Sequence, residues 1–174
     1  MQRLKTLVSR LLLLAQADSA QMPLTRSAMD LVPLLRGLAE DFADDDALTL
    51  EINLPDALPV YGDAHMLTLC LSNLLRNAVK YNRTDGRIAI SATASEAVEV
   101  RIFNTGEIIP DELRERIFER FYRIDKVRGR QSGGSGLGLS LAREIALAHG
   151  GSLHAESGGP EGNVFVLRLP CFNR

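Results

Sequence analysis

The sequence predicts an α+β fold in which helices cover one face of a single sheet. Apolar residues recur at every second position in Arg87–Ala94 and Val98–Phe103, as in half-buried strands. They recur at helical spacing in Ala64–Tyr81 and Leu137–His149. Helical and strand-like segments are mixed along the chain, and no glycine-rich turn follows a first strand. A two-layer α/β sandwich with a mixed, largely antiparallel sheet is therefore expected, and a Rossmann fold is not.

Local signals predict the remaining elements. Asp30 can cap a helix from Leu31 to about Phe42, and Asp63 can cap the helix Ala64–Tyr81. The other expected elements are a strand at Leu48–Leu54, a short helix at Pro110–Phe118, and a final hairpin formed by Ser152–Ser157 and Asn163–Leu169.

The first segment, Gln2–Asp18, is predicted to be a helix with an apolar seam. The leucines of the seam, which alternate by three and four, are Leu4, Leu7, Leu11 and Leu14. A lone helix cannot bury such a seam against itself. Either the helix folds onto its own domain, or it is half of an interrupted dimeric bundle.

Composition excludes several classes of function. The chain has 174 residues and a net charge of −2, so it has no overall attraction to nucleic acid or to anionic lipid. The amino terminus lacks the pattern of a signal peptide, and the longest apolar run, Leu11–Ala15, is too short to cross a bilayer. Cys70 and Cys171 have no metal or redox spacing and are expected to be reduced and inert.

A polar stripe borders the apolar face of the helix Ala64–Tyr81. Asn73, Asn77 and Lys80 fall at i, i+4 and i+7, and Tyr81 follows. Amide oxygens can bind Mg²⁺, a lysine can reach a phosphate, and a tyrosine ring can lie against a base. The alternative is a polar helix face that is merely solvated.

A glycine-rich segment, Ser132–Leu139, opens directly into the next amphipathic helix. Backbone N–H groups at such a helix start can bind phosphate. The segment is not a P-loop, because no Gly-Lys-Ser/Thr follows. The preceding segment, Arg120–Arg130, is basic and unpatterned, which suggests a lid over a polyphosphate. The alternatives are a flexible linker and a solvated loop.

Taken together, these segments resemble the ATP-binding domain of bacterial sensor histidine kinases, in the GHKL ATPase superfamily. Asn73-Leu-Leu-Arg-Asn-Ala-Val-Lys-Tyr81 resembles the N box, and Ile117-Phe-Glu-Arg-Phe-Tyr-Arg123 the F box. Gly134-Ser-Gly-Leu-Gly-Leu139 resembles the second glycine box. The three occur in the family's order, and the resemblance spans about Leu24 to Pro170. It implies the Bergerat α/β sandwich and binding of ATP with Mg²⁺.

The resemblance also implies roles for individual residues. Asn77, with Asn73 beside it, would hold Mg²⁺; Lys80 and Arg123 would meet the phosphates; and Tyr81 would lie at the adenine. In the second glycine box, the residues implied to contact nucleotide are Gly134, Gly136, Leu137 and Gly138. In the expected lid, the candidates are Arg128 and Gln131.

One motif departs from the family. The first glycine box usually reads Asp-x-Gly-x-Gly, whereas this chain has Asn104-Thr-Gly106-Glu-Ile108. Asn104 keeps an acceptor oxygen for the adenine amino group but loses the charge. This form resembles sensor kinases of the heavy-metal (copper and silver) type. The string Leu-Leu-Ala-Gln-Ala-Asp at Leu13–Asp18 resembles the end of their dimerisation hairpin.

The family's phospho-acceptor motif, His-Glu-x-x-x-Pro, is absent, so His65, His149 and His154 are expected to be structural. We therefore expect residues 1–20 to be the second helix of a truncated dimerisation hairpin and residues 24–171 to be the catalytic ATP-binding domain. The resemblance implies a cytoplasmic domain of a dimeric kinase in the bacterial inner membrane. Such a kinase passes phosphate from ATP, through its own histidine, to a response regulator.

Two rival functions stay open at this stage. One is another enzyme of the superfamily, such as an anti-sigma serine kinase or a chaperone-type ATPase. The F box and the leading helix argue against it. The other is a degenerate nucleotide-sensing or dimerisation module. Asn104 and Ile108 favour that alternative, and the retained Asn77 and Lys80 argue against it.

Overall fold

The structure is a computed structural model that describes residues 2–19, 22–43, 48–124 and 135–172. The helices are α1 (Gln2–Asp18), α2 (Leu31–Ala43), α3 (Ala64–Lys80) and α4 (Gly138–Ala148). The strands are β1 (Ser27–Asp30), β2 (Thr49–Asn53), β3 (Pro59–Gly62), β4 (Arg87–Ala94), β5 (Ala97–Thr105), β6 (Ser152–Ser157) and β7 (Gly162–Pro170).

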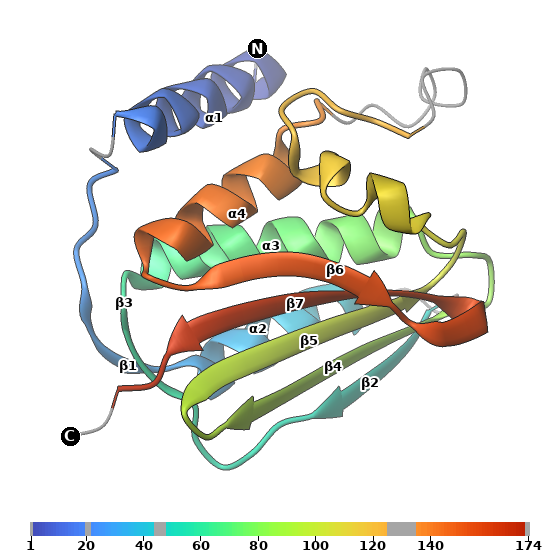
Figure 1. Cartoon of the computed structure of the whole chain (residues 1–174). Coiled ribbons are helices and arrows are strands. Elements are labelled where there is room, and N and C mark those ends of the chain that lie inside the picture. The colour runs from blue at the N-terminus through green and yellow to red at the C-terminus, as the bar shows by residue number, and fades with distance from the viewer. Residues whose placement is uncertain (1, 20–21, 44–47, 125–134, 173–174) are drawn as a thin grey trace.

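The main sheet has five strands in the order β2-β4-β5-β7-β6, and α2, α3 and α4 cover one of its faces (Figure 1). β2 and β4 run parallel, because α3 carries the chain back between them, and the other neighbours are antiparallel. The predicted α+β sandwich is confirmed. β1 and β3 form a separate antiparallel pair that the sequence did not predict, since four-residue strands are too short for a clear alternating pattern.

The core lies between the sheet and the helices. The face of α3 that was predicted to pack on the sheet is confirmed, with Leu67, Leu71 and Leu74 fully buried. Burial alternates along β4 and β5 as the sequence pattern predicts. Each fully buried leucine stabilises the fold by about 1.5–3 kcal/mol relative to an exposed one.

Both predicted helix caps are present. The carboxylate of Asp63 accepts a hydrogen bond from the Met66 N–H at 3.0 Å, and its second oxygen accepts one from Thr25 N–H at 2.7 Å. Asp30 Oδ1 accepts from the N–H groups of Val32 at 3.0 Å and Leu58 at 2.9 Å. Each carboxylate therefore caps a helix and also ties down a distant loop.

The prediction of one short helix at Pro110–Phe118 was wrong. The segment forms two 3-10 turns, at Asp111–Leu113 and Arg116–Phe118. It buries only Ile117 and Phe118, which is too little apolar surface to stabilise a regular helix.

Helix α1 lies outside the two-layer sandwich, alongside α4 (Figure 1). Leu14 is only 1% exposed and belongs to the core, whereas Leu4 and Val8 are 67% and 56% exposed. The helix thus folds onto its own domain through its carboxyl-terminal half, and much of its apolar seam is left uncovered. None of the helices in the described ranges is both long and apolar enough to span a membrane.

His149 links the end of α4 to the start of α3. Its Nε2 accepts a hydrogen bond from the backbone N–H of Asp63 at 3.0 Å, and its Nδ1 lies 2.7 Å from the carbonyl oxygen of Ile145. The ring therefore carries its proton on Nδ1, where it donates to that carbonyl. Burial lowers the pKa of the imidazole, and the contact with Ile145 and the charge of Asp63 oppose this shift only in part.

This lowered pKa predicts a pH-dependent stability. Above the ordinary histidine value of 6.5, folded and unfolded chains both hold the neutral ring. Below it, the unfolded state binds a proton that the folded state does not. The free energy of unfolding therefore decreases as the pH is lowered from 6.5 to the lowered pKa of the folded state. The slope contributed by His149 is at most about 1.4 kcal/mol per pH unit.

Urea denaturation between about pH 7 and 5.5 measures this slope. His149→Gln should flatten the dependence even if it lowers the overall stability, whereas His65→Gln, at an exposed position, should retain it. Equal slopes in the wild type and His149→Gln would contradict the assignment.

Candidate functional site

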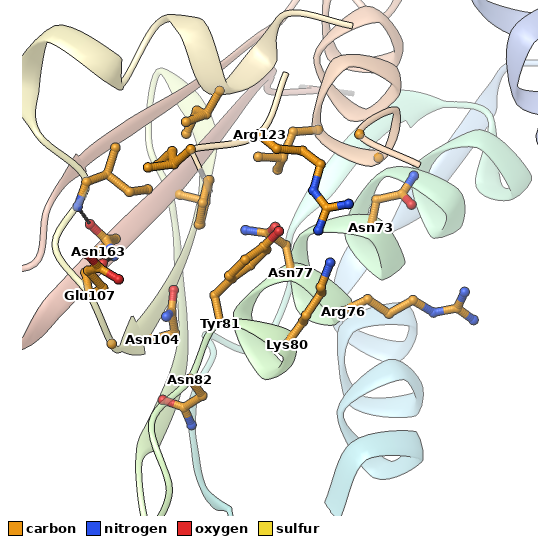
Figure 2. Close-up of a pocket in the computed structure, with 18 of the residues that line it drawn as sticks. Asn73, Arg76, Asn77, Lys80, Tyr81, Asn82, Asn104, Glu107, Arg123 and Asn163 are labelled. Carbon is orange, nitrogen blue, oxygen red and sulfur yellow. Dashed lines mark hydrogen bonds between the residues drawn. The ribbon is translucent and has the colours of Figure 1, made fainter. Parts of the chain in front are cut away.

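A cavity of about 740 Å³ lies between α3, the segment that follows β5, and the start of α4. Figure 2 shows the side chains of Asn77 and Lys80 of α3, and of Tyr81 at its end, converging on it with Arg123 from the segment before α4. The predicted site residues that line the cavity are Asn73, Asn77, Lys80, Tyr81, Asn104, Gly106, Arg123, Gly136 and Gly138.

Four predicted residues remain, and one of them, Leu137, does not line the cavity. The Leu137 side chain is fully buried in the core, and its carbonyl accepts hydrogen bonds from Leu141 N–H and Ser140 Oγ at the start of α4. The other three, which lie outside the described residues, are Arg128, Gln131 and Gly134. The predicted lid shares most of its length with that undescribed part of the chain.

The wall formed by α3 presents a stripe of amides. Asn73 is only 5% exposed, and its Nδ2 is buried without a hydrogen-bond partner in the described part of the chain. A Cβ placed on Gly138 would lie 3.4 Å from Asn73 Oδ1, so the amide stands directly beside the first residue of α4. Asn77, one turn further along, is half-buried on the same side. An unpaired buried amide is costly, and a bound polar ligand would offset that cost.

Asn104 and Gly106 form the opposite wall. Asn104 is 2% exposed, and its Nδ2 donates to the carbonyl oxygen of Thr105 at 2.9 Å. This bond orients the amide so that its oxygen faces the cavity (Figure 2). Gly106 has a φ of +152°, and a Cβ there would lie 2.3 Å from the Tyr81 carbonyl oxygen. Glycine is therefore required for the chain to pass so close to Tyr81.

Asn163, which was not among the predicted site residues, holds this wall in place. Its Oδ1 accepts from the N–H of Ile109 at 2.8 Å, and its Nδ2 donates to the carbonyl of Glu107 at 2.9 Å. Asn163 on β7 stands opposite Asn104 on β5 in the sheet. A buried asparagine at the head of an otherwise apolar strand is the signal that could have revealed it.

The start of α4 forms the third wall. Its capping position, Leu137, offers no side-chain hydrogen bond, so the first N–H groups of the helix lack that partner. Gly136 has a φ of +69°, and its carbonyl accepts from the N–H of Phe121 at 2.9 Å. The F box segment is thereby tied to the helix start. Such a helix end carries a partial positive charge and binds anions.

The charges around the cavity favour a polyanion. The described cationic side chains that line it are Arg10, Arg76, Lys80, Arg83 and Arg123, and the acidic one is Glu107. Lys80 Nζ lies 4.8 Å from the centre of the Tyr81 ring, where a cation and an aromatic face attract each other. The described residues hold no cluster of three or more His, Cys, Asp or Glu side chains that could bind a metal. Amide oxygens on the cavity wall and oxygens of a bound ligand are hard donors that Mg²⁺ accepts.

Comparison with known proteins identifies the class. Residues 62–173 match the family described as histidine kinase-, DNA gyrase B-, and HSP90-like ATPase, and the chain belongs to this family. Sensor histidine kinase CusS of Escherichia coli (strain K12) is 36% identical over 173 residues, which are 97% of this chain and 36% of that protein. The chain spans less than half the length of the curated sensor kinases that it matches.

Solved histidine kinases share the fold. Full-length ShkA in complex with AMPPNP superposes with a TM-score of 0.82 and 26% identity, over 97% of this chain and 36% of that one. Histidine kinase ThkA in complex with the response regulator TrrA gives a TM-score of 0.76 and 26% identity, over 98% of this chain and 48% of that one. The fold and the family establish the class as the ATP-binding catalytic domain of sensor histidine kinases.

The role of Asn163 can be tested through stability. Asn163→Ala should lower the free energy of unfolding by about 1–3 kcal/mol, because it leaves the Ile109 N–H and the Glu107 carbonyl without their partner. Asn53→Ala, at an exposed position on the edge strand β2, is the matched control and should change stability by less than about 0.5 kcal/mol. Denaturant unfolding of both variants checks this, and equal losses would contradict the role.

Proposed function

We propose that this chain is the part of a two-component sensor kinase that binds ATP with Mg²⁺ and presents its γ-phosphoryl group for transfer to a histidine. The main observation behind this proposal is the cavity, in which the amide stripe of α3 faces the start of α4, where no side chain caps the helix. The comparisons support the proposal through the family match and through the relatives, which are named as sensor kinases.

The nucleotide would lie along α3. Tyr81 and the Asn104 oxygen would meet the adenine, with Gly106 lining the cavity beside them. Lys80 and Arg123 would meet the phosphates, together with the backbone at Gly136 and Gly138. Asn104 can accept one hydrogen bond from the adenine amino group, but without the charge that an aspartate would bring.

Mg²⁺ fits the donors of this site. Asn77 supplies a hard amide oxygen on the cavity wall, and the phosphates of the nucleotide would supply further oxygens. Asn73, the second predicted ligand, stands one turn away, and its Oδ1 accepts a hydrogen bond from Arg10. We therefore assign the metal to Asn77 first. The ion would neutralise phosphate charge, and the chain itself would act by positioning and by fixed positive charge.

The proposal extends to the parent protein. Residues 1–20, which include α1, would be the second helix of a dimerisation hairpin, and the exposed Leu4 and Val8 support a further apolar contact. Residues 24–171 would form the catalytic domain. The phosphoryl acceptor would be a histidine outside these residues, and a response regulator would be the next acceptor. We also predict that the parent is a sensor kinase of the heavy-metal type, and the similarity to CusS is compatible with this. We further predict that this domain lies on the cytoplasmic side of a bacterial inner membrane.

The metal assignment gives a first test. Asn77→Ala and Asn77→Asp should each raise the Kd for AMPPNP in the presence of Mg²⁺ by about tenfold or more, which corresponds to ~1.4 kcal/mol. The melting temperature should change little, because Asn77 faces the cavity and not the core. Thr68→Ala, on the same helix but away from the cavity, is the control. Calorimetric titration with and without Mg²⁺ measures the effect; unchanged affinity, or a large fall in melting temperature, would count against the role.

The three histidines give a second test. His65 is exposed at the start of α3, His149 is buried at the end of α4, and His154 lies 2.9 Å from the Glu156 carboxylate on β6. None of them lines the cavity. Incubation with ATP labelled in its γ-phosphate should therefore leave no acid-labile label on the 174-residue chain. Label on any of these histidines would overturn this part of the proposal.

A further inference from the structure

Helix α1 contributes a side chain to the cavity. Arg10 lies well outside residues 62–173, over which the family matches, yet it lines the cavity with Asn73 and Arg76. Its Nη2 lies 3.4 Å from Asn73 Oδ1, a long hydrogen bond between segments 63 residues apart. The guanidinium is half-buried.

Arg10 is held there by the docking of α1. Leu14, one turn further along the helix, is 1% exposed in the core. At the end of the helix, Asp18 accepts hydrogen bonds from both terminal nitrogens of Arg120, at 2.7 Å and 2.5 Å. Arg120 Nη2 also lies 3.4 Å from the Leu14 carbonyl oxygen. A bidentate pair of this kind sets geometry as well as charge, so the helix position is defined at its carboxyl end.

The end of the cavity that Arg10 occupies is rich in positive charge. Burial, followed by the charge of Arg76, lowers the pKa of Arg10. Glu107, the acidic side chain on the described lining, stands on the wall beside Asn163, across the cavity from Arg76 (Figure 2). The half-buried guanidinium of Arg10 and the exposed guanidinium of Arg76 therefore repel each other, and a bound anion would offset that repulsion.

The position of Asn73 along α3 identifies which part of a nucleotide would reach Arg10. Tyr81 and Asn104 mark the adenine end. Asn73 lies eight residues before Tyr81, and at 1.5 Å per residue this is about 12 Å along the helix axis. A nucleotide laid along α3 from Tyr81 would bring its outermost phosphate to the end where Asn73, Arg10 and the start of α4 meet.

We propose that Arg10 is a polyphosphate-binding residue that α1 supplies to the site, and that it favours nucleoside triphosphates over diphosphates. This inference rests on the proposed nucleotide-binding function. The contact makes triphosphate binding and α1 docking mutually dependent. Each should strengthen the other by the same factor, because the coupling free energy between two binding events is reciprocal. The docking of α1, which carries the apolar seam, would thereby be stronger with a bound triphosphate than with a bound diphosphate.

Titration of the whole chain with Mg²⁺ and either AMPPNP or ADP tests the inference. Arg10→Gln should raise the Kd for AMPPNP by about tenfold and the Kd for ADP by less than about threefold. Lys5→Gln, which removes the same charge from an exposed position on the same helix, should change neither. Asp18→Asn removes the charge that pairs with Arg120 but changes no residue that lines the cavity. It should also raise the Kd for AMPPNP, as Arg10→Gln does.

The outcomes separate the inference from the proposed function. If the wild type does not bind AMPPNP, the proposed function fails. If the wild type binds and Arg10→Gln binds equally well, Arg10 makes no contact with the phosphates. If Arg10→Gln weakens AMPPNP and ADP by the same factor, the selectivity for triphosphate is overturned. The melting temperature of each variant shows whether a loss of affinity comes from a loss of folded protein.

Discussion

The close packing of α3 against α4 is the constraint on which the rest of the structure depends. Small side chains make it possible: Cys70, Ala142 and Ala146 are fully buried, and the Cys70 thiol lies 3.4 Å from the carbonyl oxygen of Ala142. Burial raises the pKa of this thiol to about 12, so it acts as a small apolar side chain. Because the helices approach so closely, the amide stripe of α3 comes to stand beside the first turn of α4.

Several groups that line the cavity cost stability unless a ligand is bound. The cavity holds a buried amide nitrogen that has no partner among the described residues, a helix start without a side-chain cap, and several cationic side chains. Next to it, Phe121 takes a φ of +61°, which is rare for a bulky residue and costs about 1–3 kcal/mol. The core of the sandwich can support these costs. All the groups that line the cavity in this way would be stabilised by an anion with oxygen acceptors. This shared preference is the physical basis for assigning a nucleotide.

Helix α1 changes how the site is delimited. The Arg120–Asp18 pair ties it to the F box segment, and Leu14 anchors it in the core. A helix attached at one end, with the apolar residues of its other half exposed, is suited to a second apolar contact. If Arg10 binds phosphate as proposed, such a contact on α1 would be coupled to the cavity through Arg10.

The sequence by itself determined the two-layer fold, the helices α1 to α4, the longer strands, and the amide and glycine sides of the site. These depend on local periodicity and capping, which neighbouring residues specify. Only the tertiary structure decided that Asn163 fixes the Glu107–Ile109 wall and that Arg10 lines the cavity. It also decided that Leu137 belongs to the core and that Pro110–Phe118 forms two turns. The contacts of Asn163 and Arg10 join residues 54 to 63 positions apart. No local pattern encodes them, because they follow from strand register and from the docking of a helix.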